Sequence, residues 1–184
     1  MVTRVVIVPG NGCGQVEQCN WYAWARDEIN KKYEGVECIL RPMPDPDMAR
    51  ESIWIPFMRD ELCCDEQTLI IGDCSGSEAT MRFVESYKVH SIILVSPCVT
   101  DLGEENEKLS GYYDRPWEWA KMRSNTQSIT VFGSTDDPYI KWAEMQEVID
   151  NLNPELHKFH DRGHFEVATF PELIPTVGRR VHKK

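Results

Sequence analysis

This sequence has few basic residues, no long apolar run and no metal-binding cysteine pattern, and each of these absences excludes a class of function. Basic residues are outnumbered, with 20 Lys and Arg against 30 Asp and Glu and a formal net charge of -10. Nucleic-acid binding needs a basic surface, so it is not expected here. Binding to anionic membranes is disfavoured for the same reason. No apolar run approaches the ~20 residues that a membrane helix requires.

A metal-binding pattern is also missing. The seven cysteines, at positions 13, 19, 38, 63, 64, 74 and 98, include no Cys-x-x-Cys pair. The adjacent Cys63 and Cys64 cannot form a standard zinc knuckle. The first residues run directly into a strand-like segment, without the pattern of a secretory signal. We therefore expect free thiols in a reducing compartment, a cytoplasmic or nuclear location, and neither metal nor cofactor.

What the sequence does contain is an alternation of short apolar runs and longer amphipathic segments. Strands are predicted at 4–9, 36–41, 68–72, 91–95, 129–132 and 155–159, and helices at 21–32, 53–62, 77–87, 140–152 and 171–181. Pro56 should start or kink the second helix. This order predicts one α/β domain over residues 1–184, a three-layer sandwich around a mostly parallel six-stranded sheet. Reactive groups should lie beyond the carboxyl ends of the strands.

The third predicted strand is followed by Gly72-Asp73-Cys74-Ser75-Gly76. A nucleophile elbow needs small residues two before and two after the nucleophile, because its strand-to-helix turn leaves no space for side chains there. The two glycines therefore assign the nucleophile position to Cys74 and not to Ser75. A thiol at a helix N-terminus should have a lowered pKa, because the helix dipole stabilises the thiolate.

Two further loops carry the partners that such a nucleophile needs. Asp137 follows the fifth predicted strand and His164 follows the sixth. The order nucleophile, acid, histidine is that of α/β-hydrolases. The pattern predicts that Asp137 orients His164, that His164 takes the thiol proton, and that Cys74 forms an acyl-enzyme that water hydrolyses.

The oxyanion of that reaction needs two donors. We expect the backbone N–H of Ser75 and one from the first loop, at Asn11 or Gly12. The same loop has glycines at 10, 12 and 14, but this spacing misses Gly-x-Gly-x-x-Gly, and no acidic residue ends the second predicted strand. A dinucleotide site is therefore not expected.

Longer strings make the chain resemble the retinoblastoma-binding protein 9 family of small serine hydrolases. The resemblance rests on residues 8–12 (VPGNG), 43–46 (MPDP), 49–54 (ARESIW), 101–103 (DLG), 115–117 (RPW), 132–138 (FGSTDDP) and 163–165 (GHF). It implies an α/β-hydrolase fold without a large lid, a monomer, and catalytic roles for Cys74, Asp137 and His164. It also implies an acyl pocket containing Trp21 and Trp54 and open to small esters, amides or thioesters.

The chain departs from that family at two elbow positions. Cys74 replaces the family's serine and Asp73 replaces a histidine; the added negative charge should raise the thiol pKa. An alternative function is therefore a weak or silent homologue that binds a retinoblastoma-type pocket protein through Leu62-x-Cys64-x-Glu66. That motif has only three defined positions, and burial of its segment would hide it. A further alternative is redox sensing by Cys74 or a neighbouring thiol.

Overall fold

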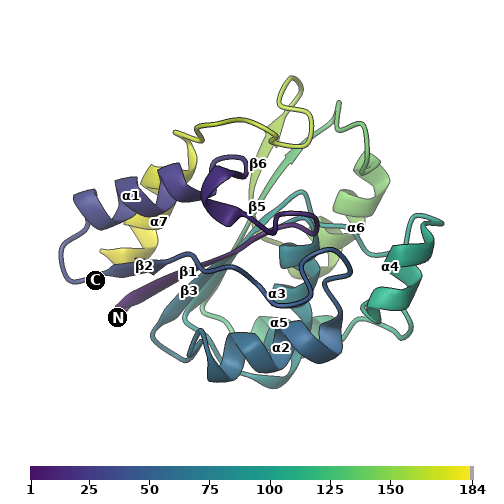
Figure 1. Ribbon diagram of the computed structural model, residues 1–184, viewed down its shortest axis with the longest axis horizontal. Helices are drawn as coiled ribbons and strands as arrows, with labels where there is room; N and C mark the ends of the chain where they lie inside the picture. The colour runs from purple at the N-terminus through teal and green to yellow at the C-terminus, as the bar shows by residue number, and fades with distance from the viewer. Residues whose placement is uncertain (183–184) are drawn as a thin grey trace.

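At the centre of the protein is one six-stranded sheet, in a computed structural model that describes residues 1–182 (Figure 1). Its strands lie in the order β2-β1-β3-β4-β5-β6, and each pairs with its neighbours in parallel. The predicted sheet is therefore confirmed, and all six strands are parallel. Their bounds are β1 (Arg4–Val8), β2 (Glu37–Ile39), β3 (Thr68–Asp73), β4 (Ser91–Val95), β5 (Ser128–Ser134) and β6 (Glu155–Phe159).

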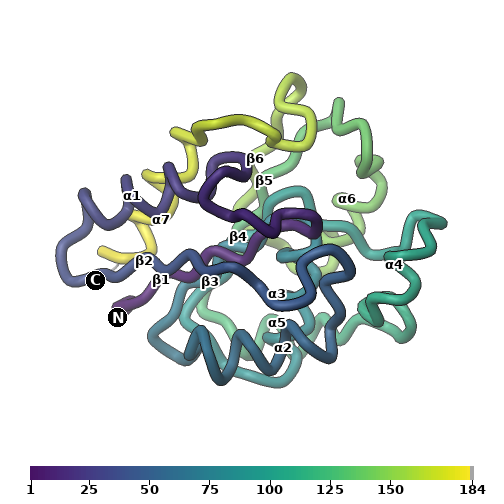
Figure 2. The backbone as a smooth tube through the Cα atoms, in the orientation of Figure 1, coloured from purple at the N-terminus to yellow at the C-terminus, as the bar shows by residue number. Residues whose placement is uncertain are grey.

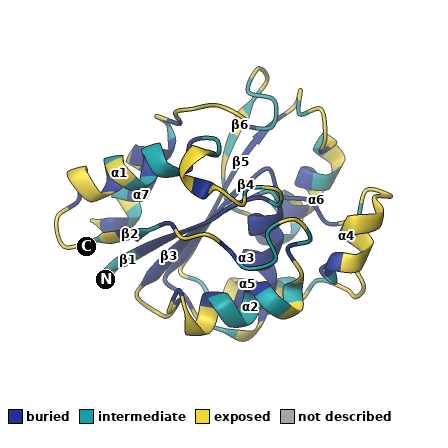
Figure 3. Cartoon of the chain, viewed as in Figure 1, coloured by how far each residue is buried: buried dark blue, intermediate teal, exposed yellow. Residues whose placement is uncertain are grey.

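The central strands are apolar because helices cover both of their faces. Every residue of β3 and β4 is buried, whereas β6, at one edge, alternates between half-buried and exposed positions. Figure 3 shows the same gradient, with dark blue central strands and yellow patches on the outer helices. The continuous apolar runs of the sequence therefore mark the middle of the sheet.

Helices form a layer on each side of the sheet (Figures 1 and 2). One layer contains α1 (Tyr22–Lys32) and α7 (Leu173–Val181), whose apolar side chains share a core cluster with β1. The other contains α2 (Glu51–Asp60), α3 (Ser75–Ser86), α5 (Trp119–Ser124) and α6 (Trp142–Leu152), which bury a second cluster. The predicted three-layer sandwich is thus observed.

Several local features differ from the sequence prediction. Helix α2 begins before Pro56 and continues through it, so this proline does not start the helix. The short helices η1 (Val16–Gln18), α4 (Glu105–Ser110) and α5 were not predicted, because three to six residues give too little periodicity to recognise. Two of these, α4 and α5, lie in the long connection between β4 and β5.

A buried arginine organises that long connection. Arg82 of α3 pairs with Glu85 at 2.7 Å and donates to the backbone carbonyls of Tyr112, Arg115 and Pro116. These contacts give the guanidinium N–H groups hydrogen-bond acceptors and a counter-ion in the core, where an unpaired charge would lower the stability of the fold. They also hold residues 112–116 against α3, next to the carboxyl ends of the strands.

Strand order places a crevice above the middle of the sheet. β1 is flanked by β2 and β3, so the chain continues to one side of the sheet after β1 and to the other side after β3. The place where the direction reverses is a topological switch point, and ligands of α/β proteins bind there. The register aligns Val8 with Gly72, so the loop after β1 and the loop after β3 leave the sheet side by side. Across residues 1–182, no helix is long and apolar enough to cross a membrane.

Candidate active site

The turn after β3 has the strained geometry of a nucleophile elbow. Cys74 precedes α3 with φ 55° and ψ -116°, a backbone conformation that residues other than glycine rarely adopt. A Cβ on Gly72 would lie 2.3 Å from the carbonyl oxygen of Gly76, and one on Gly76 would lie 2.1 Å from that of Val8. Both glycines are therefore sterically required, as the sequence pattern indicated.

The two other predicted partners lie beside this turn. Nδ1 of His164 lies 2.7 Å from Oδ2 of Asp137, and the imidazole lies beside the Cys74 thiol, close enough for each group to shift the pKa of the other. Oδ1 of Asp137 accepts the backbone N–H groups of Tyr139 and Ile140, at 2.8 and 2.9 Å. The aspartate is thus held on both oxygens, and the structure brings Cys74, His164 and Asp137 together at one site.

The environment of this site affects both proton-carrying groups. Burial raises the pKa of the Cys74 thiol, and the nearby Glu78 and Asp73 carboxyls add to the increase, although the neighbouring His164 opposes it. Burial alone would lower the pKa of His164, but the hydrogen bond with Asp137 and the neighbouring Cys74 thiol outweigh it and raise this pKa to about 11. Both groups therefore retain their protons to higher pH than when free in water.

Two backbone N–H groups near Cys74 are available to an incoming oxyanion. Within the described part of the chain, neither Ser75 N nor Asn11 N donates to a protein acceptor. The N–H of Gly12, in contrast, donates to the carbonyl of Pro46 at 2.9 Å. Of the two first-loop donors that the sequence left open, Gly12 is therefore wrong, because its hydrogen is already used, and Asn11 remains.

A cavity of about 590 Å³ opens above Cys74 and His164. Its wall includes Tyr113 from the long connection after β4 and Tyr139 from the loop after β5. Trp21 and Trp54 are fully buried in the two core clusters and do not line this cavity. The structure therefore corrects their prediction as pocket residues: helix packing turns both indoles toward the core.

A carboxyl group that the sequence analysis missed lies in the same wall. Glu78 is buried on α3, one turn after Cys74, and its Oε1 accepts from the Cys98 thiol at 3.1 Å and the Tyr113 hydroxyl at 2.9 Å. Burial raises its pKa to about 8. The sequence did contain a signal for Glu78. It is an acidic residue four positions, or about one helical turn, after the nucleophile, in a helix that is otherwise buried.

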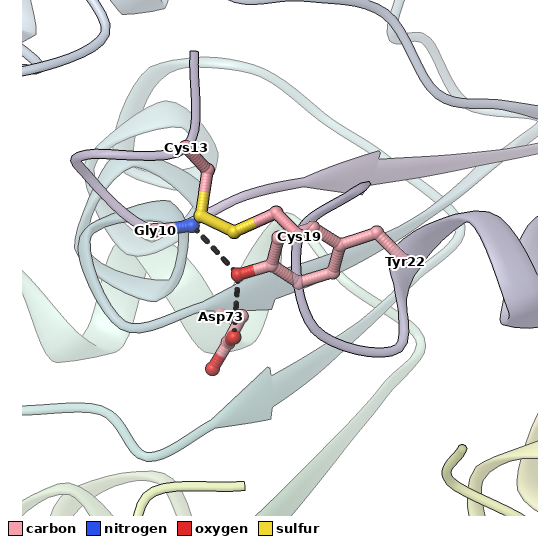
Figure 4. Close-up of a disulfide and its surroundings, with 5 residues drawn as sticks. All are labelled: Gly10, Cys13, Cys19, Tyr22 and Asp73. Atoms are coloured by element: carbon pink, nitrogen blue, oxygen red, sulfur yellow. Dashed lines mark hydrogen bonds between the residues drawn. A yellow bond between two sulfur atoms is a disulfide. The ribbon is translucent and has the colours of Figure 1, made fainter. Parts of the chain in front are cut away.

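Asp73, the second departure from the family pattern, is buried below the same cavity. Its Oδ2 accepts the Tyr22 hydroxyl at 2.6 Å, and that hydroxyl accepts the backbone N–H of Gly10 at 3.0 Å (Figure 4). Burial raises the pKa of Asp73 to about 6, although the charge of His164 and the hydrogen bond from Tyr22 oppose the increase. This network joins the loop after β1 to the elbow.

A disulfide joins Cys13 to Cys19 beside this network (Figure 4). The expectation that all seven cysteines are free thiols is therefore wrong for this pair, because η1 turns the chain back and places their Cα atoms 5.9 Å apart. The other five cysteines are free, and Cys38 and Cys64 are buried. Both disulfide residues line the cavity.

The predicted partner motif lies largely in the core. Leu62 and Cys64 are 2% and 7% exposed and belong to the core cluster under α2, whereas Glu66 is exposed. Helix α2 ends at Asp60, two residues before Leu62. A partner would have to extract two core side chains, so binding of a retinoblastoma-type protein stays a prediction that no contact in the structure favours.

Comparisons with known proteins agree with this architecture. Residues 5–181 match the Serine hydrolase family, so the chain belongs to this family of small hydrolases. It is 53% identical to the serine hydrolase RBBP9 of Rattus norvegicus over 175 residues, which cover 95% of this chain and 94% of the relative. The resemblance inferred from sequence motifs is confirmed.

Solved structures share the fold at low sequence identity. The ydeN gene product of B. subtilis superimposes with a TM-score of 0.87 and 19% identity, covering 99% of this chain and all of that one. A lipase-esterase related protein from Clostridium acetobutylicum gives a TM-score of 0.68 at 11% identity, covering 96% and 93% of the two chains. The predicted α/β-hydrolase fold is therefore confirmed.

Proposed function

We propose that this chain hydrolyses ester, amide or thioester bonds of small acyl substrates, with Cys74 as the nucleophile. The observation that carries the proposal is that Cys74 lies beside His164, which is hydrogen-bonded to Asp137, at the carboxyl ends of three strands. Nucleophile, base and orienting acid in this arrangement define covalent acyl transfer. The cavity beside them has the volume of a small-molecule site.

The reaction proceeds through an acyl-enzyme. Sγ of Cys74 attacks the substrate carbonyl carbon while the thiol proton passes to His164. The carbonyl oxygen becomes an oxyanion, which accepts the N–H groups of Ser75 and Asn11. His164 then gives its proton to the departing alcohol, amine or thiol. It next takes a proton from water, which attacks the thioester carbon. His164 returns that proton to Sγ as the C–S bond breaks, which frees Cys74 and the product acid.

The raised pKa of the Cys74 thiol sets the pH dependence of this reaction. Because burial and two carboxyl groups oppose the thiolate, the reactive state forms only after the thiol–imidazole pair loses a proton. We therefore expect acylation to accelerate as the pH rises past ~8.5, the pKa of an unperturbed thiol. This resistance to ionisation also predicts a slower enzyme than one with an unhindered thiolate.

The test is stopped-flow hydrolysis of p-nitrophenyl acetate, with intact mass spectrometry of the acylated protein. The wild type should show a burst and an acetyl adduct on Cys74. Cys74→Ala should abolish both, and His164→Ala should slow acylation by about 100-fold or more. Cys63→Ala removes an exposed thiol away from the cavity and is the matched control. An unchanged burst in Cys74→Ala would refute the proposal.

A further inference from the structure

The cavity wall has an excess of acidic side chains. Its lining includes the side chains of five acidic residues, and none of the described residues that line it is Lys or Arg. Glu104 and Glu166 are exposed at the surface, Glu107 is half-buried, and Asp73 and Glu78 are buried. His164 also lines the cavity, but the acidic residues outnumber it, and such an excess attracts cationic ligands in low-dielectric surroundings.

Two of these carboxyl groups have an oxygen without a partner. Glu78 and Asp73 are 1% and 2% exposed, and Oε2 of Glu78 and Oδ1 of Asp73 have no hydrogen-bond partner among the described residues. In Figure 4 the second oxygen of Asp73 has no hydrogen bond to the other residues drawn. A buried polar atom without a partner costs free energy, and a ligand that supplies the missing donor recovers it. Both residues line the cavity, which is the space from which a ligand would approach their carboxyl groups.

Glu78 is the better placed of the two for a substrate. It lies four residues after Cys74 on the same face of α3, and its negative charge acts directly on the thiol. Cys98 and Tyr113 hold its Oε1 in place and leave Oε2 for a ligand. Glu78 and Cys74 line the same cavity, so one ligand can contact both side chains.

A protonated amine suits this oxygen better than a metal ion does. Among the described residues, no group of three or more His, Cys, Asp or Glu side chains is arranged to hold a metal. A protonated amine needs only one carboxylate and offers three N–H donors. A protonated amine can therefore pair with one free carboxylate oxygen in a confined cavity, whereas a metal ion would require several ligands.

We infer that Glu78 selects substrates whose short acyl chain carries a protonated amino group, which donates to Oε2 of Glu78 while Cys74 attacks the acyl carbon. This inference rests on the function proposed above. When the cation binds, Glu78 releases its own proton to solvent and becomes the counter-ion. The raised pKa of free Glu78, about 8, agrees with a carboxyl group that lacks a cation.

The test compares two isosteric esters of 4-methylumbelliferone, the 3-aminopropanoyl and the butanoyl ester, which differ by an ammonium in place of a methyl group. The wild type should have kcat/KM roughly tenfold or more higher for the aminopropanoyl ester, because a buried hydrogen bond to a charged group is a strong one. In Glu78→Gln this ratio should fall to about one. Glu147→Gln removes an exposed charge far from the cavity and should keep the wild-type ratio.

Separate outcomes distinguish this inference from the proposed function. Cleavage of the butanoyl ester at an equal or greater rate, or a ratio unchanged by Glu78→Gln, would overturn the role of Glu78 and leave the hydrolase proposal intact. If neither ester is cleaved, the hydrolase proposal fails. Calorimetric titration of Cys74→Ala with 3-aminopropanamide and butanamide then tests the cation site alone. Preference for the aminopropanamide would support it, and no preference would overturn it.

Discussion

Replacement of Asp73 by asparagine should remove a pH-dependent loss of stability that this buried carboxyl group causes. Asp73 is 2% exposed and its pKa is raised from 3.8 to about 6, chiefly by burial. An acid whose pKa is higher in the folded state binds protons more tightly there than in the unfolded chain. Its destabilising effect is therefore absent below about pH 4, develops between the two pKa values, and is complete above about pH 6.

The size of this effect follows from the shift. At ~1.36 kcal/mol per pKa unit, an increase from 3.8 to about 6 corresponds to ~3 kcal/mol. The Asp73→Asn variant keeps the shape and an oxygen that accepts the Tyr22 hydroxyl but does not ionise. Relative to the wild type, its free energy of unfolding should therefore increase by about 2 kcal/mol between pH 4 and pH 7, because the carboxyl of the unfolded chain is already partly ionised at pH 4.

The assay is urea denaturation of both proteins at several pH values, followed by tryptophan fluorescence. Only the difference between variant and wild type is interpreted, because titrating groups distant from Asp73 contribute equally to both. Asp47→Asn, at an exposed position outside the cavity, is the control and should show no such difference. Parallel stability curves for wild type and Asp73→Asn across this pH range would refute the account of Asp73 as a buried, unsatisfied carboxylate.

The remaining predictions concern the disulfide and the elbow. Alkylation of the denatured, unreduced protein should label five of its seven cysteines, leaving Cys13 and Cys19 unmodified until a reductant is added; labelling of all seven would contradict the disulfide. Gly76→Ala should lower the free energy of unfolding by about 3 kcal/mol, the upper end of the cost of overpacking, because its Cβ would meet the Val8 carbonyl. Gly14→Ala is the matched control, since its Cβ would come no nearer than 3.8 Å to another atom; equal stability of the two variants would contradict the steric argument.

The strand pattern and the elbow were predictable because they depend on local sequence. Continuous apolar runs identified the buried strands, and the glycine spacing around Cys74 reflects a turn that excludes Cβ atoms. The order of Asp137 and His164 was predictive for a related reason. In a parallel sheet, successive strands end at the same edge, so residues far apart in sequence meet there. Chain order alone was therefore enough to bring these groups together.

Other features depend on contacts that no local pattern encodes. The choice of Asn11 over Gly12 depends on a hydrogen bond to Pro46 across the loop, and the burial of Trp21 depends on packing between layers. The pairing of Cys13 with Cys19 required the short turn between them, which is too brief to show periodicity.

Residue spacing and apolar periodicity were enough to predict the sheet, the elbow and the order of Cys74, Asp137 and His164 along the chain, because both patterns reflect local geometry. The charge and the burial of the groups in the cavity wall, in contrast, depend on tertiary contacts. These contacts bury Glu78 beside the Cys74 thiol and leave one of its oxygens without a partner. The physical reason is that charge and desolvation in a cavity depend on which side chains surround it, and these come from segments distant in the chain.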